Sequence, residues 1–118
     1  MTRAHHKLRA WQEAVTLVKL VYRFTGQFPA DERYGLMSQM RRAAVSVPSN
    51  ISEGAARATS ADMVRFLVMA RGSLAELETQ VIIANELGFS RPDAELTDQL
   101  DTVFSLLGGL IRQKQDVL

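Results

Sequence analysis

The sequence contains no cysteine and no apolar run long enough to cross a membrane. Without cysteine the chain has no disulfide bonds, thiolate zinc sites or cysteine nucleophiles, so its stability must come from packing. A membrane-spanning helix needs about 18 or more apolar residues in a row, and the N-terminus leads into an amphipathic pattern with no signal-peptide core. Its 118 residues suffice for one hydrophobic core. We therefore expect a single domain over residues 1–118, cytoplasmic and with no membrane partner.

The side chains that most enzymes and metal sites need are also scarce. The only histidines, His5 and His6, are adjacent, so they do not converge on one metal ion, and we expect them at a solvated terminus. The sequence has no Glu-x-x-His pair, which excludes the usual di-iron site of a helical bundle, and no glycine-rich phosphate loop. These absences predict a non-enzymatic protein with no cofactor, no metal and no small-molecule substrate.

Apolar residues recur at helical spacing in four segments, which predicts helices over about residues 7–25, 36–57, 60–87 and 91–115. The clearest stripe alternates steps of four and three and comprises Met63, Leu67, Ala70, Leu74, Leu77, Val81 and Ala84. The fourth segment repeats the pattern with Leu96, Leu100, Val103, Leu107 and Leu110. Thr59 or Ser60 is the expected N-cap of the third helix, and Ser90 that of the fourth. Short connections and the absence of strand patterns predict an all-α, antiparallel up-down-up-down four-helix bundle.

Pro48 lies inside the second of these segments. The apolar stripe nevertheless keeps its phase on both sides of it, through Leu36, Met40, Ala44, Val47 and Ile51. Proline removes the amide that would bond the Ala44 carbonyl and crowds that turn, so we expect one helix kinked near Pro48. The alternative is that a new helix starts here, because Asn50 and Glu53 have the spacing of a capping box.

Apolar residues outside a single stripe indicate contact with other subunits. The first segment carries two neighbouring stripes, one with Leu8, Trp11, Val15, Val18 and Tyr22, the other with Ala14, Leu17, Val21, Phe24 and Phe28. The third segment has Phe66, Val68, Ile82 and Ile83 beside its main stripe. Because so much apolar surface exceeds the need of one bundle, we expect a homo-oligomer.

The net charge of +1 hides an asymmetry between the two halves of the chain. Residues 1–57 carry nine lysines and arginines against four acids, and residues 58–118 carry five against nine. Such a split can mark a face that binds a polyanion, or it can let the basic half lie beside the acidic half.

Arg41 and Arg42 stand out within the basic half. Their guanidinium groups, with the hydroxyls of Ser46 and Ser49 on the same polar side, offer donors that suit phosphate oxygens. In the alternative interpretation, the small serines permit close helix approach and Glu53 pairs with an arginine. The residues themselves leave both interpretations open.

Four blocks of the sequence resemble a known family. They read LRAWQEAVTLVKLVYRFTGQFP, YGLMSQMRRAAVSVPSNISEGAAR, RFLVMARGSLAELETQVIIANELGF and GLIRQK. These blocks are similar to the four-helix-bundle proteins encoded by intervening sequences of bacterial 23S ribosomal RNA genes. A related branch comprises the accessory variability proteins of diversity-generating retroelements, which have basic surfaces that meet nucleic acid. The resemblance implies an antiparallel four-helix bundle that assembles into a homopentamer.

The resemblance also points to four basic positions as candidate nucleic-acid-binding residues: Arg41, Arg42, Arg57 and Arg65. The connection ARATSAD between the second and third helices is less basic than in many relatives. Our hypothesis is a non-enzymatic homo-oligomeric module that binds RNA or a ribonucleoprotein partner through arginines of its basic half. The alternative is a protein-protein interaction scaffold without nucleic-acid contact.

Overall fold

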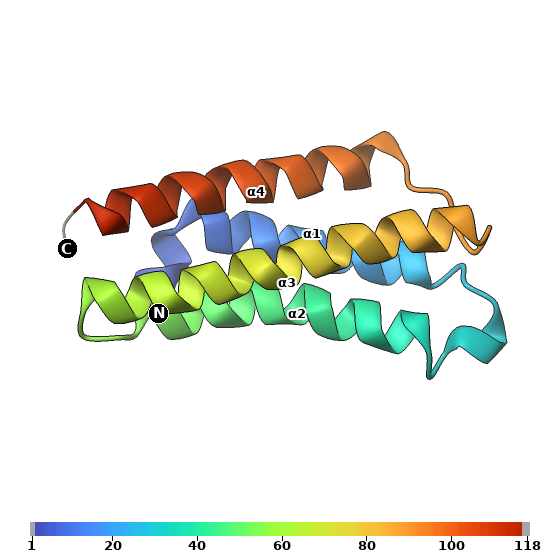
Figure 1. Ribbon diagram of the computed structural model, residues 1–118, viewed down its shortest axis with the longest axis horizontal. Coiled ribbons are helices and arrows are strands. Elements are labelled where there is room, and N and C mark those ends of the chain that lie inside the picture. Colours follow the sequence, from blue (N-terminus) through green and yellow to red (C-terminus); the bar gives the residue numbers. More distant parts are fainter. Residues whose placement is uncertain (1, 117–118) are drawn as a thin grey trace.

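The computed structural model describes residues 2–116 as a bundle of four antiparallel helices (Figure 1). Residues 1, 117 and 118 of the domain expected over 1–118 lie outside this description. The elements in chain order are η1 (Ala4–Lys7), α1 (Arg9–Thr25), η2 (Ala30–Glu32), α2 (Leu36–Ala55), α3 (Ser60–Glu86) and α4 (Ala94–Gln115). The prediction of an all-α four-helix bundle is confirmed. Within the described range, no helix has the length and apolar character that a membrane span requires.

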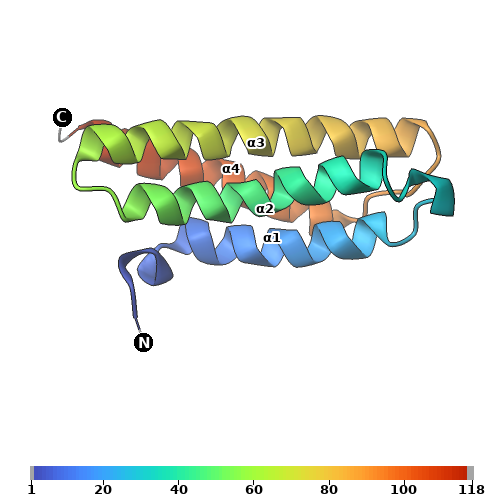
Figure 2. The same ribbon diagram turned by 90° about the horizontal axis from the view of Figure 1, so that it is seen from below.

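Each helix lies beside two others in a square cross-section. Helices α1 and α3 both pack against α2 and α4, while within residues 2–116 the backbones of α1 and α3, and those of α2 and α4, do not approach each other closely. Figures 1 and 2 together show α1 and α3 on one diagonal, and α2 and α4 on the other. Each helix therefore turns one face to the core and leaves an outward face open.

The predicted stripes form the core of this square. From α3, Leu67, Leu74 and Leu77 are completely buried, whereas Met63 packs at the margin. On α4 the stripe ends on buried Ile111, and the predicted Leu110 is only partly buried. A repeat of 3.6 residues permits a final step of three or four, so packing decides between these two neighbours.

Helix α2 continues without a break through Pro48, so the restart at Asn50 is wrong. The Asn50 side chain instead donates a hydrogen bond to the Ser46 carbonyl at 2.8 Å. Val47 and Ile51 on either side of the proline are completely buried, which keeps the stripe in phase. The bend near Pro48 stays a prediction.

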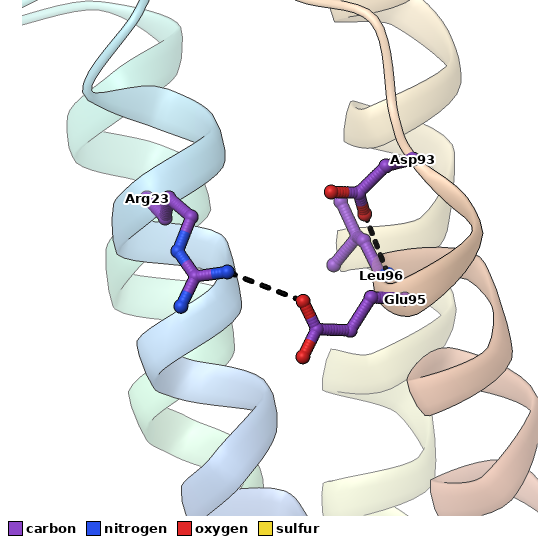
Figure 3. A network of polar contacts seen from close by, with 4 residues as sticks. All are labelled: Arg23, Asp93, Glu95 and Leu96. Carbon is purple, nitrogen blue, oxygen red and sulfur yellow. Dashed lines mark hydrogen bonds and ion pairs between the residues drawn. The ribbon is translucent and has the colours of Figure 1, made fainter.

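The helix starts show where local sequence rules succeed and fail. Thr59 Oγ1 accepts a hydrogen bond from the Asp62 amide at 3.1 Å, which confirms Thr59 as the N-cap of α3. The expected N-cap Ser90 of α4 is wrong: Asp93 Oδ1 accepts from the Leu96 amide at 2.9 Å (Figure 3). Pro92 disfavours helical backbone at Arg91, which a Ser90 cap would make the first residue of the helix, and α4 instead begins at Ala94.

Gly54 near the end of α2 sets how closely this helix approaches α3. A Cβ atom there would lie 3.0 Å from the Phe66 Cβ and 3.1 Å from the Met63 carbonyl oxygen. Both are tight contacts, and the second involves backbone that cannot move aside without shifting α3. Glycine is therefore required by space at this position.

Replacing Gly54 with alanine should destabilise the bundle by about 1–3 kcal/mol, because the added methyl group overpacks the contact with α3. Gly109→Ala in α4 is the matched control, since its Cβ would meet only the end of the flexible Arg112 side chain, at 4.0 Å. Here the better helix propensity of alanine should stabilise the protein by up to about 1 kcal/mol. Urea denaturation followed by circular dichroism measures both changes. Equal effects of the two substitutions would contradict the steric explanation.

Candidate nucleic-acid interface

The four candidate arginines do not form one site within a subunit. Arg41 lies in the second turn of α2, whereas Arg57 follows the end of that helix. Sixteen residues at 1.5 Å each separate the two positions by roughly 24 Å along the helix axis. Arg65 lies in α3 just beyond the same turn as Arg57. In Figure 1 this turn lies at the opposite end of the bundle from η2.

Arg57 and Arg65 both contact the ring of Phe66. Their guanidinium carbons lie 4.4 Å and 4.8 Å from the ring centroid, within the range of cation-π attraction. Arg65 also pairs with Asp62 at 3.7 Å across one turn of α3. Phe66 itself is buried inside the subunit, so it adds nothing to the exposed apolar surface. These contacts give both arginines a local structural role, and their binding role stays a prediction.

Arg41 ties α2 to the last turn of α1. Its Nε donates a hydrogen bond to Thr25 Oγ1 at 2.9 Å, and its Nη2 donates to the Tyr22 carbonyl at 3.3 Å. The guanidinium carbon also lies over the Tyr22 ring, 4.3 Å from its centroid. A cation is favoured here because the carbonyl groups at the end of α1 carry partial negative charge. The position of the Arg41 side chain is therefore fixed by the fold.

Arg42 has a different environment, although it is the next residue. It is exposed and lines an open pocket together with Arg33 and Arg41, where η2 and its connection join α1 to α2. The pocket has a volume of about 480 Å³. We call it the basic pocket, and its lining residues are Tyr22, Arg33, Tyr34, Met37, Ser38, Arg41, Arg42 and Val45. Figure 2 shows η2 beyond the adjoining ends of α1 and α2.

The arginines of the basic pocket keep their charge unpaired. Between residues 2 and 116 the ion pairs are those of Arg65 with Asp62 and of Arg23 with Glu95, so neither involves the pocket. Figure 3 shows Arg23 reaching across to Glu95 in the first turn of α4, at 3.2 Å. Three arginines therefore line the basic pocket, and none of them forms an ion pair within the described residues.

Two acidic residues, Asp31 and Glu32, lie in η2 directly before Arg33, but within the described residues neither forms an ion pair with an arginine of the basic pocket. Glu32 Oε1 accepts a hydrogen bond from the Leu36 amide at 3.3 Å and so caps the start of α2. Glu76 and Arg42 line a second hollow of about 480 Å³ between α2 and α3, but they form no ion pair. Glu53, expected in the alternative interpretation to pair with an arginine, has no such partner within the described chain.

The histidines lie far from this pocket and form no metal site. His5 and His6 lie beside Trp11 with ring centroids 5.0 Å and 5.2 Å away, and both stay partly exposed at the start of the chain. Desolvation lowers the pKa of His5, and the neighbouring His6 and Arg3 lower this pKa further. In the part of the chain that the structure describes, no cluster of three or more potential metal-binding side chains occurs.

Three residues of the basic pocket were not singled out by their sequence pattern. Arg33, Tyr34 and Tyr22 come from a connection and from the edge of an apolar stripe, and only the turn between α1 and α2 brings them together. The sequence does contain one signal for this site. Tyr34 lies in the polar segment PADERYG, outside every apolar helical stripe, so the pattern gives no reason to expect its ring in the core.

Comparison with known proteins identifies the family. The family model of the 23S rRNA-intervening sequence protein matches residues 6–109, which covers most of the chain, and the chain belongs to this family. The resemblance seen in the four sequence blocks is thereby confirmed. A comparison with curated proteins finds no match.

The contrast between Arg41 and Arg42 can be tested by stability. Arg41→Gln should lower the free energy of unfolding by about 1–2 kcal/mol, because it removes a charged donor from Thr25 and the Tyr22 carbonyl, and a cation from the Tyr22 ring. Arg42→Gln should change it by less than about 0.5 kcal/mol, as is usual for exposed sites. Thermal and urea unfolding of both variants measure the difference. Similar losses for the two would show that Arg41 does not anchor α2 to α1.

Proposed function

We propose that this member of the 23S rRNA-intervening sequence protein family is a non-enzymatic, homo-oligomeric module that binds RNA through the basic pocket. The observation that carries the proposal is the gathering of Arg33, Arg41 and Arg42 around one open pocket without a carboxylate partner among residues 2–116. Guanidinium groups are well suited to bind phosphate oxygens, because their planar donors match two oxygens at once. The resemblance to the retroelement accessory proteins, whose basic surfaces meet nucleic acid, favours a nucleic acid as the polyanion.

The three arginines would contribute in different ways. Arg42 and Arg33 are exposed, so their side chains are free to meet phosphates. Arg41 is held by Thr25 and Tyr22 and presents its charge from a fixed position. Salt-dependent attraction would then come mainly from Arg33 and Arg42, and Arg41 would shape the wall of the pocket.

The outward face of α3 supports the homo-oligomeric part of the proposal. Val68, Ile82 and Ile83 are 40%, 56% and 41% exposed on this face. A continuous strip without charge joins these residues at helical spacing: Val68, Gly72, Ala75, Thr79, Ile82 and Ile83. Single exposed apolar residues are ordinary, but an uncharged strip along one helix is typical of a protein interface.

A second copy of the chain is the occupant that we propose for this strip. A Cβ atom at Gly72 would meet nothing within 4 Å, so a neighbouring helix has room to approach closely. Arg65 and Glu76 flank the strip on one side and Arg71 and Glu78 on the other, which gives a polar rim with both charges. By resemblance, the expected assembly is a pentamer. A scaffold without RNA contact is the second candidate, and the local roles of Arg57 and Arg65 favour it.

RNA binding can be measured by fluorescence anisotropy of a labelled single-stranded oligonucleotide over a series of salt concentrations. For each phosphate contact, log affinity should fall by about 0.7 per unit of log salt. The variant with both Arg33→Gln and Arg42→Gln should bind more weakly and lose about 1.4 of this slope for each subunit engaged. Arg9→Gln removes a single positive charge roughly 20 Å away from Tyr22 along α1 and should leave the slope unaltered.

Two results would count against this proposal. If the protein shows no salt-dependent RNA binding near physiological ionic strength, the scaffold without RNA contact takes its place. If the double variant binds with the wild-type slope, RNA contacts another surface, and the turn that carries Arg57 and Arg65 becomes the next place to test.

Assembly can be measured by light scattering, which should give a multiple of the 13.1 kDa chain mass at micromolar concentration. Thr79→Arg, in the middle of the strip, should lower this mass because it places an unpaired charge in the interface. Thr16→Arg on α1 is a matched control: both threonines are exposed, and both donate to the carbonyl four residues earlier, at 3.4 Å and 3.0 Å for Thr16 and Thr79. A monomeric wild type would remove the homo-oligomer from the proposal.

A further inference from the structure

We infer that the basic pocket takes a single-stranded segment of RNA, with one unpaired base stacked on the Tyr34 ring and the adjoining phosphates held by Arg33 and Arg42. This inference rests on the proposed RNA-binding function and adds the form of RNA that the pocket selects. It depends on three features of the pocket: an open aromatic ring, a preorganised wall, and unpaired positive charge beside both.

Tyr34 supplies the open ring. Its side chain is 89% exposed, the highest value among the exposed large hydrophobic residues. Such exposure means that the ring gains little from packing inside its own subunit. A ring with free faces can stack on any nucleobase, because every base has a flat π-face. Tyr34 also lines the same pocket as Arg33, Arg41 and Arg42, so a base attached to a phosphate bound there would lie close to its ring.

Tyr22 and Arg41 form the preorganised wall. The Arg41 guanidinium is fixed 4.3 Å above the Tyr22 ring by its two hydrogen bonds to the end of α1. Tyr22 is still 43% exposed, so this pair presents accessible surface to a ligand. Because the pair is ordered before binding, the ligand does not have to immobilise it, which lowers the entropic cost of binding.

Single-stranded RNA fits these features better than duplex RNA. Bases in a duplex are already paired and stacked, so Tyr34 could not reach one without disrupting the helix, whereas an unpaired base is free to stack. The arginines alone would not distinguish the two forms, since both present phosphates. The aromatic ring therefore predicts a preference for single strands.

An acidic peptide is the competing occupant, because arginines bind carboxylates as well. Peptides are commonly held along a sheet edge or in an apolar helix-binding groove. Residues 2–116 form no strand that could offer an edge. The apolar lining of the pocket beyond its two tyrosines is limited to Met37 and Val45, too little for a helix-binding groove. RNA is thus the occupant that the lining favours.

The experiment compares a 12-nucleotide single-stranded RNA with the duplex of the same sequence, by anisotropy at fixed salt with the full chain. The wild type should bind the single strand more tightly. Tyr34→Ala should weaken this binding by about 5- to 150-fold, the usual effect of losing one base–aromatic stack. Tyr34→Phe keeps the ring and should bind like the wild type. Neither substitution removes charge, so the salt slope should stay unchanged in both.

The outcomes separate this inference from the proposed function. Salt-dependent binding that does not distinguish single strand from duplex, or that is unaffected by Tyr34→Ala, would overturn the inference and leave RNA binding by the arginines intact. Absence of salt-dependent binding to either RNA would overturn both. If labelled poly-glutamate binds while neither RNA does, the occupant is an acidic peptide. Because Tyr34 is exposed, circular dichroism should show the same fold for all variants.

Discussion

The structure depends on burying one apolar stripe from each of four helices around a common axis. Fully burying a leucine contributes about 1.5–3 kcal/mol, and six leucines of this core are completely buried: Leu17, Leu67, Leu74, Leu77, Leu96 and Leu107. In a square of antiparallel helices this burial uses only the inward faces. The outward faces are left for other purposes, and both proposed surfaces lie outside the core, one on the outer face of α3 and one at the junction of α1 and α2.

The same packing creates the basic pocket. Helices α1 and α2 are antiparallel neighbours, so the end of α1 lies beside the start of α2, and the connection between them must cross this end of the bundle. Tyr22 on α1 is thereby brought next to Arg41 on α2, and the connection adds Arg33 and Tyr34. Arg41 then stabilises the junction that positions it, because it donates both to Thr25 and to the Tyr22 carbonyl. Arg41 thus has a structural role, whereas the proposed contact with phosphates falls mainly to the exposed Arg42 and Arg33.

The packing of α3 has two further features. One is a very tight contact with α2, and the other is a buried polar group whose hydrogen bonding is incomplete. Gly54 allows α2 to meet α3 at a distance that no larger residue would permit. Gln80 on α3 is buried, and its Oε1 has no hydrogen-bond partner among residues 2–116. A buried polar atom of this kind lowers stability, since it loses water without gaining a replacement. The apolar stripes must therefore supply enough stability to tolerate it.

Features that depend on residues close to one another along the chain could be predicted before the structure was known. The four helices, the unbroken path of α2 through Pro48 and the Thr59 cap follow from the helical repeat and from side chains that bond their own backbone within one turn. The family too was recognisable from linear blocks. The tertiary structure alone decided which arginine anchors a helix and which is free, because that difference depends on α1 residues 16 or more positions away. It also decided that Tyr34 stands beside three guanidinium groups, since no periodic pattern governs a connection whose course is set by the helices it joins.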